Sequence, residues 1–233
     1  MNSVQEKPLR VEQTFVLEVP RWKRVLDIVL IVACSIFIIP ISVVIALIIR
    51  VVSNGPILFR QERVGYQGKT FMCYKFRSMH VDADTAVHHG HLDQLMKSGK
   101  PMVKMDASGD PRLIPFGLVL RSSGLDEIPQ LLNVLRGEMS LVGPRPCLPF
   151  EAARYLPWQR ERFNTLPGLT GLWQVSGKNN TTFEEMIRLD IAYSRKLSPW
   201  TDLRIMLKTI PALIVQMIET RRRRRQSAQT QPA

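Results

Sequence analysis

The stretch Leu125-Asp126-Glu127-Ile128-Pro129-Gln130-Leu131-Leu132-Asn133-Val134-Leu135-Arg136-Gly137 decides how the rest of this 233-residue chain is interpreted. Its leucines and isoleucine recur at helical spacing, Pro129 stands where a first turn tolerates proline, and Gly137 marks an end. Ser122 or Ser123 is expected to cap the start. The pattern predicts a short helix that carries the carboxylates of Asp126 and Glu127 in its first turn.

The segment that follows this helix holds one arginine rigidly. Met139-Ser140-Leu141-Val142 predicts a short buried strand, and Gly143-Pro144-Arg145-Pro146 fixes the backbone on both sides of one guanidinium. Arg121 precedes the acidic pair, and both arginines offer always-charged donors that suit phosphate oxygens. A carboxylate at a helix start keeps its charge, but such acids are also common there without any function. We expect the acidic pair and the two arginines to face one pocket.

These residues resemble the signature of the bacterial sugar transferases, the monotopic polyprenyl-phosphate phosphoglycosyl transferases. The resemblance extends from about Arg21 to Ile218 and includes further blocks in the same order, which are Pro56–Gly65, Phe71–Met79 and Leu166–Gly177. It implies transfer of a sugar-1-phosphate from a UDP-sugar to undecaprenyl (polyprenyl) phosphate, with release of UMP. This reaction begins exopolysaccharide, capsule, O-antigen or glycoconjugate assembly. No residue indicates which sugar is transferred.

The resemblance also implies roles for particular residues. Our hypothesis is a two-step reaction in which Asp126 attacks the phosphate that bears the sugar, and Glu127 acts as a base or orients the incoming phosphate. Mg²⁺ is the expected cofactor, and Asp126 is expected to contact it. The residues expected to bind substrate phosphates are Arg121, Arg145, Lys75, Arg77 and Arg112. For Lys75 and Arg77 a solvated strand face is an equally good interpretation.

The amino-terminal part contains an apolar run of membrane length. Residues 28–49 include no charged residue. This run is too long, and begins too late in the chain, to be a cleaved signal peptide. A buried core helix is the alternative, and basic residues at both ends leave the orientation open. Pro40 removes a backbone hydrogen bond near the middle, and is expected to break the helix so that it turns back to the face it entered from. A straight span that tolerates proline is the other arrangement. The family resemblance favours the re-entrant one, although the family usually breaks at a Ser-Pro pair and this chain has Ile39-Pro40.

The charge of the chain calls for an anionic partner. The formal net charge is +12 and the sequence pI is about 10.1. Phosphorylated substrates and membrane lipids satisfy this requirement, and no nucleic acid is expected because no known nucleic-acid-binding motif is recognised. A membrane-anchored basic nucleic-acid-binding protein and a non-catalytic scaffold are the alternatives, and a homodimer is left open. Cys34, Cys73 and Cys147 have no metal-ligand spacing and indicate reduced thiols.

The remaining segments predict further elements. The residues between 80 and 111 indicate a variable insertion, in which His88, His89 and His91 more often belong to a solvated loop than to a metal site. Residues 150–163 predict an amphipathic helix and 172–175 a strand, while the glycines of Leu166–Gly177 permit a close backbone approach, either to a nucleotide or in a tight turn. Thr182-Phe183-Glu184-Glu185 has the form of a capping box, and Pro199 begins an apolar helix that suits a membrane interface or the core.

Together these segments predict a small mixed α/β (α+β) catalytic domain, rich in helices, on an N-terminal re-entrant membrane helix, with interfacial amphipathic helices. The predicted organisation is a mobile tail at 1–20, a membrane-embedded helix at 21–50, a cytosolic transferase domain at 51–219 and a basic disordered tail at 220–233. The expected location is the bacterial inner membrane, with the catalytic domain on its cytoplasmic face.

Overall fold

The computed structural model describes residues 18–80, 112–177 and 181–230, together with positions 90, 95, 96, 98, 99 and 101. The predicted tail up to residue 17 and most of the predicted insertion, with its three histidines, lie outside the described residues. The described elements, in chain order, are α1 (Arg21–Val52), β1 (Leu58–Val64), η1 (Tyr66–Gly68), β2 (Thr70–Phe76), α3 (Gly117–Ser123), η3 (Leu125–Gln130), α4 (Leu131–Arg136), β3 (Ser140–Val142), α5 (Pro149–Ala153), η4 (Pro157–Asn164), β4 (Gly168–Thr170), α6 (Leu172–Val175), α7 (Phe183–Arg195) and α8 (Pro199–Thr230). The predicted mixed, helix-rich α/β class is confirmed.

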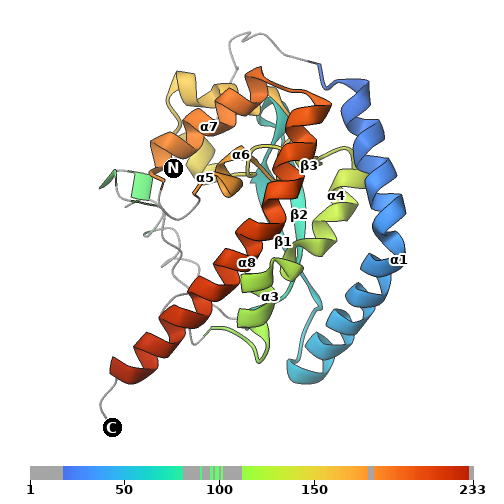
Figure 1. The fold of residues 1–233 in the computed structure, drawn as a ribbon, viewed down its shortest axis with the longest axis vertical. Helices are drawn as coiled ribbons and strands as arrows, with labels where there is room; N and C mark the ends of the chain where they lie inside the picture. Colours follow the sequence, from blue (N-terminus) through green and yellow to red (C-terminus); the bar gives the residue numbers. More distant parts are fainter. Residues whose placement is uncertain are drawn as a thin grey trace, which may run out of the picture.

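Helix α1 runs along one side of the molecule and is bowed outward (Figure 1). It is the one helix in the described residues that is long and apolar enough to cross a membrane. The helix continues through Pro40, so the predicted break at this residue is wrong. One missing backbone hydrogen bond does not end a helix whose neighbouring residues are apolar, and the Ser42 hydroxyl donates to the carbonyl of Ile38 in the turn beside it. The re-entrant topology stays a prediction.

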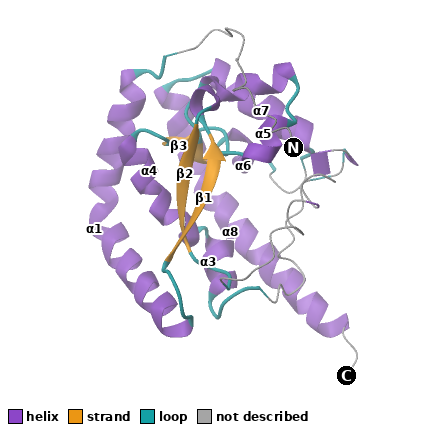
Figure 2. Ribbon diagram, turned by 180° about the vertical axis from the view of Figure 1, so that it is seen from behind, coloured by secondary structure: helices purple, strands orange, loops and turns teal. Residues whose placement is uncertain are grey.

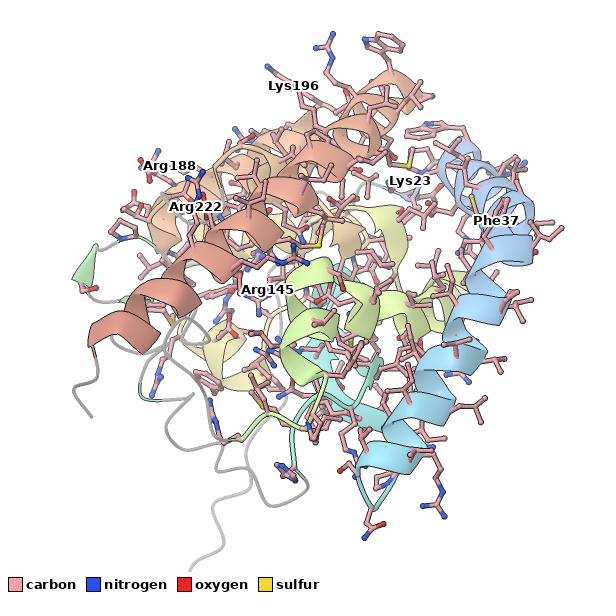
Figure 3. All side chains as sticks on the ribbon, turned by 60° about the horizontal axis from the view of Figure 1, so that its bottom comes forward. Lys23, Phe37, Arg145, Arg188, Lys196 and Arg222 are labelled. Carbon is pink, nitrogen blue, oxygen red and sulfur yellow. The ribbon has the colours of Figure 1, made fainter. Side chains whose placement is uncertain are left out.

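Both ends of α1 contact the same globular body. Near the start Lys23 and Asp27 are buried, and near the end Ile45 and Ile49 pack with Phe76 and its neighbours. The middle is exposed, with Ile36 at 71% and Phe37 at 70% of full exposure. Figure 3 shows Phe37 pointing away from the body and Lys23 pointing into it. The apolar surface of α1 is therefore largest between two fastened ends.

A buried polar network fastens the start of α1. The Lys23 ammonium donates to the Val142 carbonyl at 2.7 Å, to the Tyr193 hydroxyl at 2.9 Å and to the Asp202 carboxylate at 2.6 Å. One turn further, the Asp27 carboxylate accepts from the Ser140 hydroxyl and the Leu141 amide, both at 3.0 Å. A buried charge is stable only when it is paired and hydrogen-bonded. These contacts join α1 to β3, α7 and α8.

The end of α1 is fastened by Arg77. Its guanidinium donates to the carbonyls of Ser53 and Asn54, at 2.8 and 2.7 Å, where a helix end leaves carbonyls without partners. The residue is 4% exposed. We therefore do not retain Arg77 as a phosphate-binding residue, because its donors hold the turn that follows α1.

The strands form two small sheets at the centre of the molecule (Figure 2). β1 and β2 are an antiparallel hairpin in which Leu58 pairs with Phe76 and Val64 with Thr70. β3 and β4 are parallel, with Ser140 opposite Gly168. Residues 172–175 form the short helix α6, so the predicted strand there is wrong and β4 lies just before it. A short apolar run does not distinguish a strand from a helical turn.

The close backbone approach predicted for the glycines of Leu166–Gly177 occurs, and it is between two segments of the backbone. A Cβ atom on Gly168 would lie 2.0 Å from the Gly143 nitrogen, and one on Gly171 would lie 2.3 Å from the Gly143 carbonyl oxygen. No side chain fits at such distances. The structure therefore favours the tight-turn interpretation: these glycines hold the loop that carries Arg145 directly against β4.

Two long helices complete the carboxyl-terminal part. Helix α7 begins with the predicted capping box, in which the Glu185 amide donates to the Thr182 hydroxyl and the Glu185 carboxylate accepts from the Thr182 amide.

Residues 150–163 form α5 and η4, separated near Pro157, instead of one amphipathic helix. Helix α8 extends to Thr230, so the predicted disorder is wrong for residues 220–230. Its exposed apolar side chains are Trp200, Leu203, Leu207, Ile210, Ile214, Val215 and Ile218.

Candidate active site

The acidic pair lies in the first turn of a short helix, as predicted; this part is the 3-10 helix η3, and α4 follows it directly. Gly124 precedes it with φ 75°, and Gly137 ends α4 with φ 82°, conformations that favour glycine. Gly124 occupies the cap position itself, and the hydroxyls of Ser122 and Ser123 donate to the Val119 carbonyl. The Ser123 hydroxyl also accepts from the Leu125 amide at 3.4 Å, so this serine contacts the start of η3 as expected. The predicted stop at Gly137 is confirmed. Asp126 is buried, at 7% exposure, in the first turn of η3.

Lys75 connects β2 to the acidic pair. Its ammonium donates to the Glu127 carboxylate at 2.7 Å. Both side chains are partly exposed, at 24% and 36%. The pair therefore stands at the surface of the site, where Lys75 sets the direction of the Glu127 carboxylate and remains within reach of a bound anion.

Asn133 fixes the register between β2 and the acidic helix. Its side-chain amide donates to the Met72 carbonyl at 2.7 Å, and its side-chain oxygen accepts from the Tyr74 amide at 3.2 Å. The Asn133 side chain thus pairs with backbone groups of β2 in the way that a neighbouring strand would. The same amide donates to Glu138 at 2.6 Å. Asn133 is fully buried. This side chain determines which residue of β2 faces Glu127.

We expect Asn133→Asp to destabilise the protein by about 1–3 kcal/mol, because the new carboxylate oxygen would face the Met72 carbonyl and the Glu138 carboxylate without a proton to donate. Thermal unfolding of the detergent-solubilised protein would measure this change. Asn54→Asp, at an exposed position, is the matched control. Equal melting temperatures for the two variants would contradict the register role of Asn133.

Arg145 follows β3 and is half-buried. Its guanidinium has no hydrogen bond or ion pair with any residue of the described ranges, whereas its backbone is fixed. The carbonyl of Arg145 accepts from Arg162 at 2.8 Å, and the next carbonyl, of Pro146, accepts from Arg63 at 3.2 Å. In Figure 3 Arg145 lies near the centre of the view. A fixed backbone with an uncommitted guanidinium is suited to bind an anion.

Cys73, on β2, lies where these groups meet. Burial raises the pKa of its thiol, and the charges of Lys75, Arg63, Glu127 and Arg145 all act on it. Of the predicted residues, Lys75 and Glu127 are thus in direct contact, and Arg145 is close enough for its charge to act on the same thiol. Burial likewise raises the pKa of the Cys147 thiol to about 11. Neither cysteine forms a disulfide in the described residues, and the reduced state of the thiols stays a prediction.

The other two residues predicted to bind phosphate, Arg112 and Arg121, precede the acidic pair in the sequence. Arg121 is in α3, where its guanidinium contacts the Met79 sulfur at 3.9 Å. Arg112 lies in the turn whose carbonyl accepts from the His80 amide. Their predicted roles stay predictions.

The carboxylates of Asp126 and Glu127 fit the requirements of Mg²⁺. The described residues contain no group of three side chains that would hold a metal by themselves. Mg²⁺ keeps several waters and is usually bound by one or two carboxylates together with substrate phosphates. The adjacent pair on η3 supplies that number of carboxylates beside the basic residues that suit a diphosphate.

Sequence reasoning missed Asn133, Arg63, Arg162 and the Lys23 network. Asn133 stands inside a helical pattern, and Arg63 alternates with other charges along a strand, which is typical of a solvated face. The burial of each depends on segments far away in the chain. Only the block Pro56–Gly65, in which Arg63 falls, carried a signal, since it matched the family pattern.

Comparison with known proteins identifies the family of the chain. Residues 19–216 match the family model described as bacterial sugar transferase. The chain is 35% identical over 191 residues to the exopolysaccharide production protein ExoY of Sinorhizobium fredii, covering 82% of this chain and 84% of that protein. It is 40% identical over 200 residues to the UDP-glucose:undecaprenyl-phosphate glucose-1-phosphate transferase of Caulobacter vibrioides, covering 82% of this chain and 69% of that protein.

A further match shows that the segment also occurs in longer proteins. The chain is 41% identical over 163 residues to the galactosyl transferase CpsE of Streptococcus agalactiae, which covers 70% of this chain and 35% of that protein. The chain thus spans about a third of that relative and most of ExoY. The family match covers α1, the acidic pair, Arg145 and most of α8. The chain belongs to the bacterial sugar transferase family.

Proposed function

We propose that this protein transfers a sugar-1-phosphate from a UDP-sugar to undecaprenyl phosphate and releases UMP. The observation that carries this proposal is the arrangement of two carboxylates, Asp126 and Glu127, beside Lys75 and a guanidinium, Arg145, that has no partner in the described residues. The names of the relatives support it, because they include a glucose-1-phosphate transferase and a galactose phosphotransferase that act on undecaprenyl phosphate. Another relative is named an exopolysaccharide production protein, and we propose that the reaction of this protein begins the assembly of an exopolysaccharide, capsule, O-antigen or glycoconjugate.

The proposed reaction has two steps. In the first, a carboxylate oxygen of Asp126 forms a bond to the phosphorus that bears the sugar, and the bond from this phosphorus to the oxygen of UMP breaks. In the second, the phosphate oxygen of undecaprenyl phosphate attacks the same phosphorus and releases the Asp126 carboxylate. Asp126 suits this role because it sits in the first turn of a helix, where the backbone favours an anion.

The neighbouring residues stabilise charge and position the substrates. Arg145 binds phosphate oxygens, whose negative charge grows in the transition state. Lys75 holds Glu127 at 2.7 Å, which leaves that carboxylate directed toward the incoming lipid phosphate. Mg²⁺, held by Asp126 and Glu127 together with the diphosphate, would neutralise charge on the leaving UMP.

The test is an assay of UMP release by detergent-solubilised protein with Mg²⁺, undecaprenyl phosphate and a panel of UDP-sugars that begins with UDP-glucose and UDP-galactose. We expect repeated turnover with at least one donor, and at most one UMP per protein when the lipid is omitted. Protein that is folded by thermal unfolding and releases no UMP with any donor would contradict the proposal.

We also propose that α1 enters the cytoplasmic face of the inner membrane and returns to it. Lys23 and Asp27 near its start and Ile49 near its end all contact one globular body. A straight span would place these two ends on opposite sides of the bilayer, where one body cannot reach both. The exposed apolar side chains of α8, next to Arg204 and Lys208, would then lie at the same interface.

Cys34, in the exposed middle of α1, tests this location. In sealed vesicles we expect a charged, membrane-impermeant maleimide to label none of the three cysteines, because the bilayer covers Cys34 and the protein buries Cys73 and Cys147. All three should react after denaturation. A Ser53→Cys variant, just beyond the end of α1, is the matched positive control. Labelling of Cys34 as fast as that control would contradict insertion of the middle of α1.

A further inference from the structure

Arg63 carries a buried positive charge that no carboxylate neutralises by direct contact. It lies on β1 and is 6% exposed. Its guanidinium donates to the Pro146 carbonyl at 3.2 Å and to the Gln61 side-chain oxygen at 2.6 Å, and both acceptors are neutral. Among the residues that the structure describes, Arg63 forms no ion pair. Glu151 acts on it only through space.

Arg162 performs a similar backbone task with its charge paired. It donates to the Arg145 carbonyl at 2.8 Å, to the Asp190 carboxylate at 2.5 Å and to the Tyr155 hydroxyl at 2.5 Å. Two buried guanidinium groups therefore hold two consecutive carbonyls of the loop that carries Arg145. Only one of them has a carboxylate partner.

Arg162 has a carboxylate partner and Arg63 has none in the described residues, which indicates that the charge of Arg63 has a function. An unpaired charge inside a protein is strongly unfavourable, and a neutral amide would satisfy a carbonyl equally well. Arg63 donates to the carbonyl of Pro146, the residue directly after Arg145, so the two cations belong to the same small region. Burial, followed by the charges around it, of which Arg145 is the largest, lowers the pKa of Arg63. Two cations close together repel each other, and an anion that binds beside them relieves this repulsion.

We propose that Arg63 is a positioning residue for the substrate diphosphate. It holds the Pro146 carbonyl and so fixes the loop of Arg145. Its charge also raises the positive potential beside that guanidinium, where the low dielectric strengthens its effect on a bound anion. The inference rests on the proposed function, which supplies the diphosphate. Bound diphosphate then compensates the charge that is unpaired in the free protein.

The test compares Arg63→Met with Arg162→Met. We expect Arg63→Met to melt at the same temperature as the parent or higher, because it removes an unpaired buried charge. Its kcat/KM for the UDP-sugar should fall about 30- to 100-fold. Arg162→Met should melt at a lower temperature, because Asp190 loses its partner. A role that is only structural predicts the reverse for Arg63→Met: lower stability, with activity lost only as far as the protein unfolds.

Two further measurements separate charge from shape. Arg63→Gln keeps a donor for the Pro146 carbonyl, so an activity equal to that of the parent would overturn the electrostatic part of the proposal. Mg²⁺ and UDP should raise the melting temperature of the parent more than that of Arg63→Met, and equal shifts would also overturn it. If the parent releases no UMP, the proposed function fails, whereas the order of the two melting temperatures still tests the unpaired charge.

Discussion

Asp126→Asn is expected to lower the rate of UMP release by about 10⁴-fold or more, the effect of removing a nucleophile from an enzyme that forms a covalent intermediate. The amide has nearly the shape of the carboxylate but does not attack phosphorus. Because Asp126 is buried at the start of η3, the substitution also removes an anion from the end of a short helix, a much smaller effect on stability. The measurement is UMP release with freshly purified protein, before the amide hydrolyses.

Two controls make this result specific. With a UDP-sugar that is labelled in the sugar phosphate, and without lipid, the parent should retain about one label per protein, which hydroxylamine releases from an acyl phosphate. Asp126→Asn should retain none. Glu184→Gln removes a carboxylate from an exposed pair with Arg188 and should leave turnover unchanged. Full turnover, or labelling, of Asp126→Asn would show that another group is the nucleophile.

Lys23→Met is expected to destabilise the protein by about 3–5 kcal/mol, because it leaves the Asp202 carboxylate buried without a cation. For a chain of this length the melting temperature should fall by about 6 to 20 °C. Tyr193 still donates to Asp202 at 2.6 Å but carries no charge. Tryptophan fluorescence during heating of the detergent-solubilised protein would measure the change.

The double variant Lys23→Met/Asp202→Leu isolates the pair. Because neither charge then remains, we expect most of the lost stability to return, as is common when a buried ion pair is replaced by apolar side chains. Lys208→Met, on the exposed face of α8, should change the melting temperature little. A double variant as unstable as the sum of its single variants would contradict the description of Lys23 and Asp202 as one unit.

Local patterns predicted the elements whose causes are local. The capping box at Thr182 and the stop at Gly137 depend on residues within one turn, and both are confirmed. The strand predicted at 172–175 was wrong because a short, mostly apolar run suits a helical turn as well as a strand. The acidic pair was found because its motif is contiguous in the sequence.

Long-range contacts explain what sequence patterns missed or misassigned. Arg77 and Lys75 alternate on one strand and looked equivalent, but Arg77 contacts the end of α1 and Lys75 contacts Glu127. Lys23 was considered only as a flanking charge of an apolar helix, and its partner Asp202 lies 179 positions later in the chain. No local pattern contains that information.

The separation of Lys23 from Asp202 determines the order in which this protein is assembled. Helix α1 leaves the ribosome well before Tyr193 and Asp202, which complete the environment of Lys23 and follow it by 170 and 179 positions. During most of translation the apolar helix is therefore available to lipid, and the lysine at its start is still in water. Closure of so long a loop is slow, so we expect α1 to meet lipid before the fold is complete. The network around Lys23, which fastens α1 in the finished protein, therefore forms late in folding.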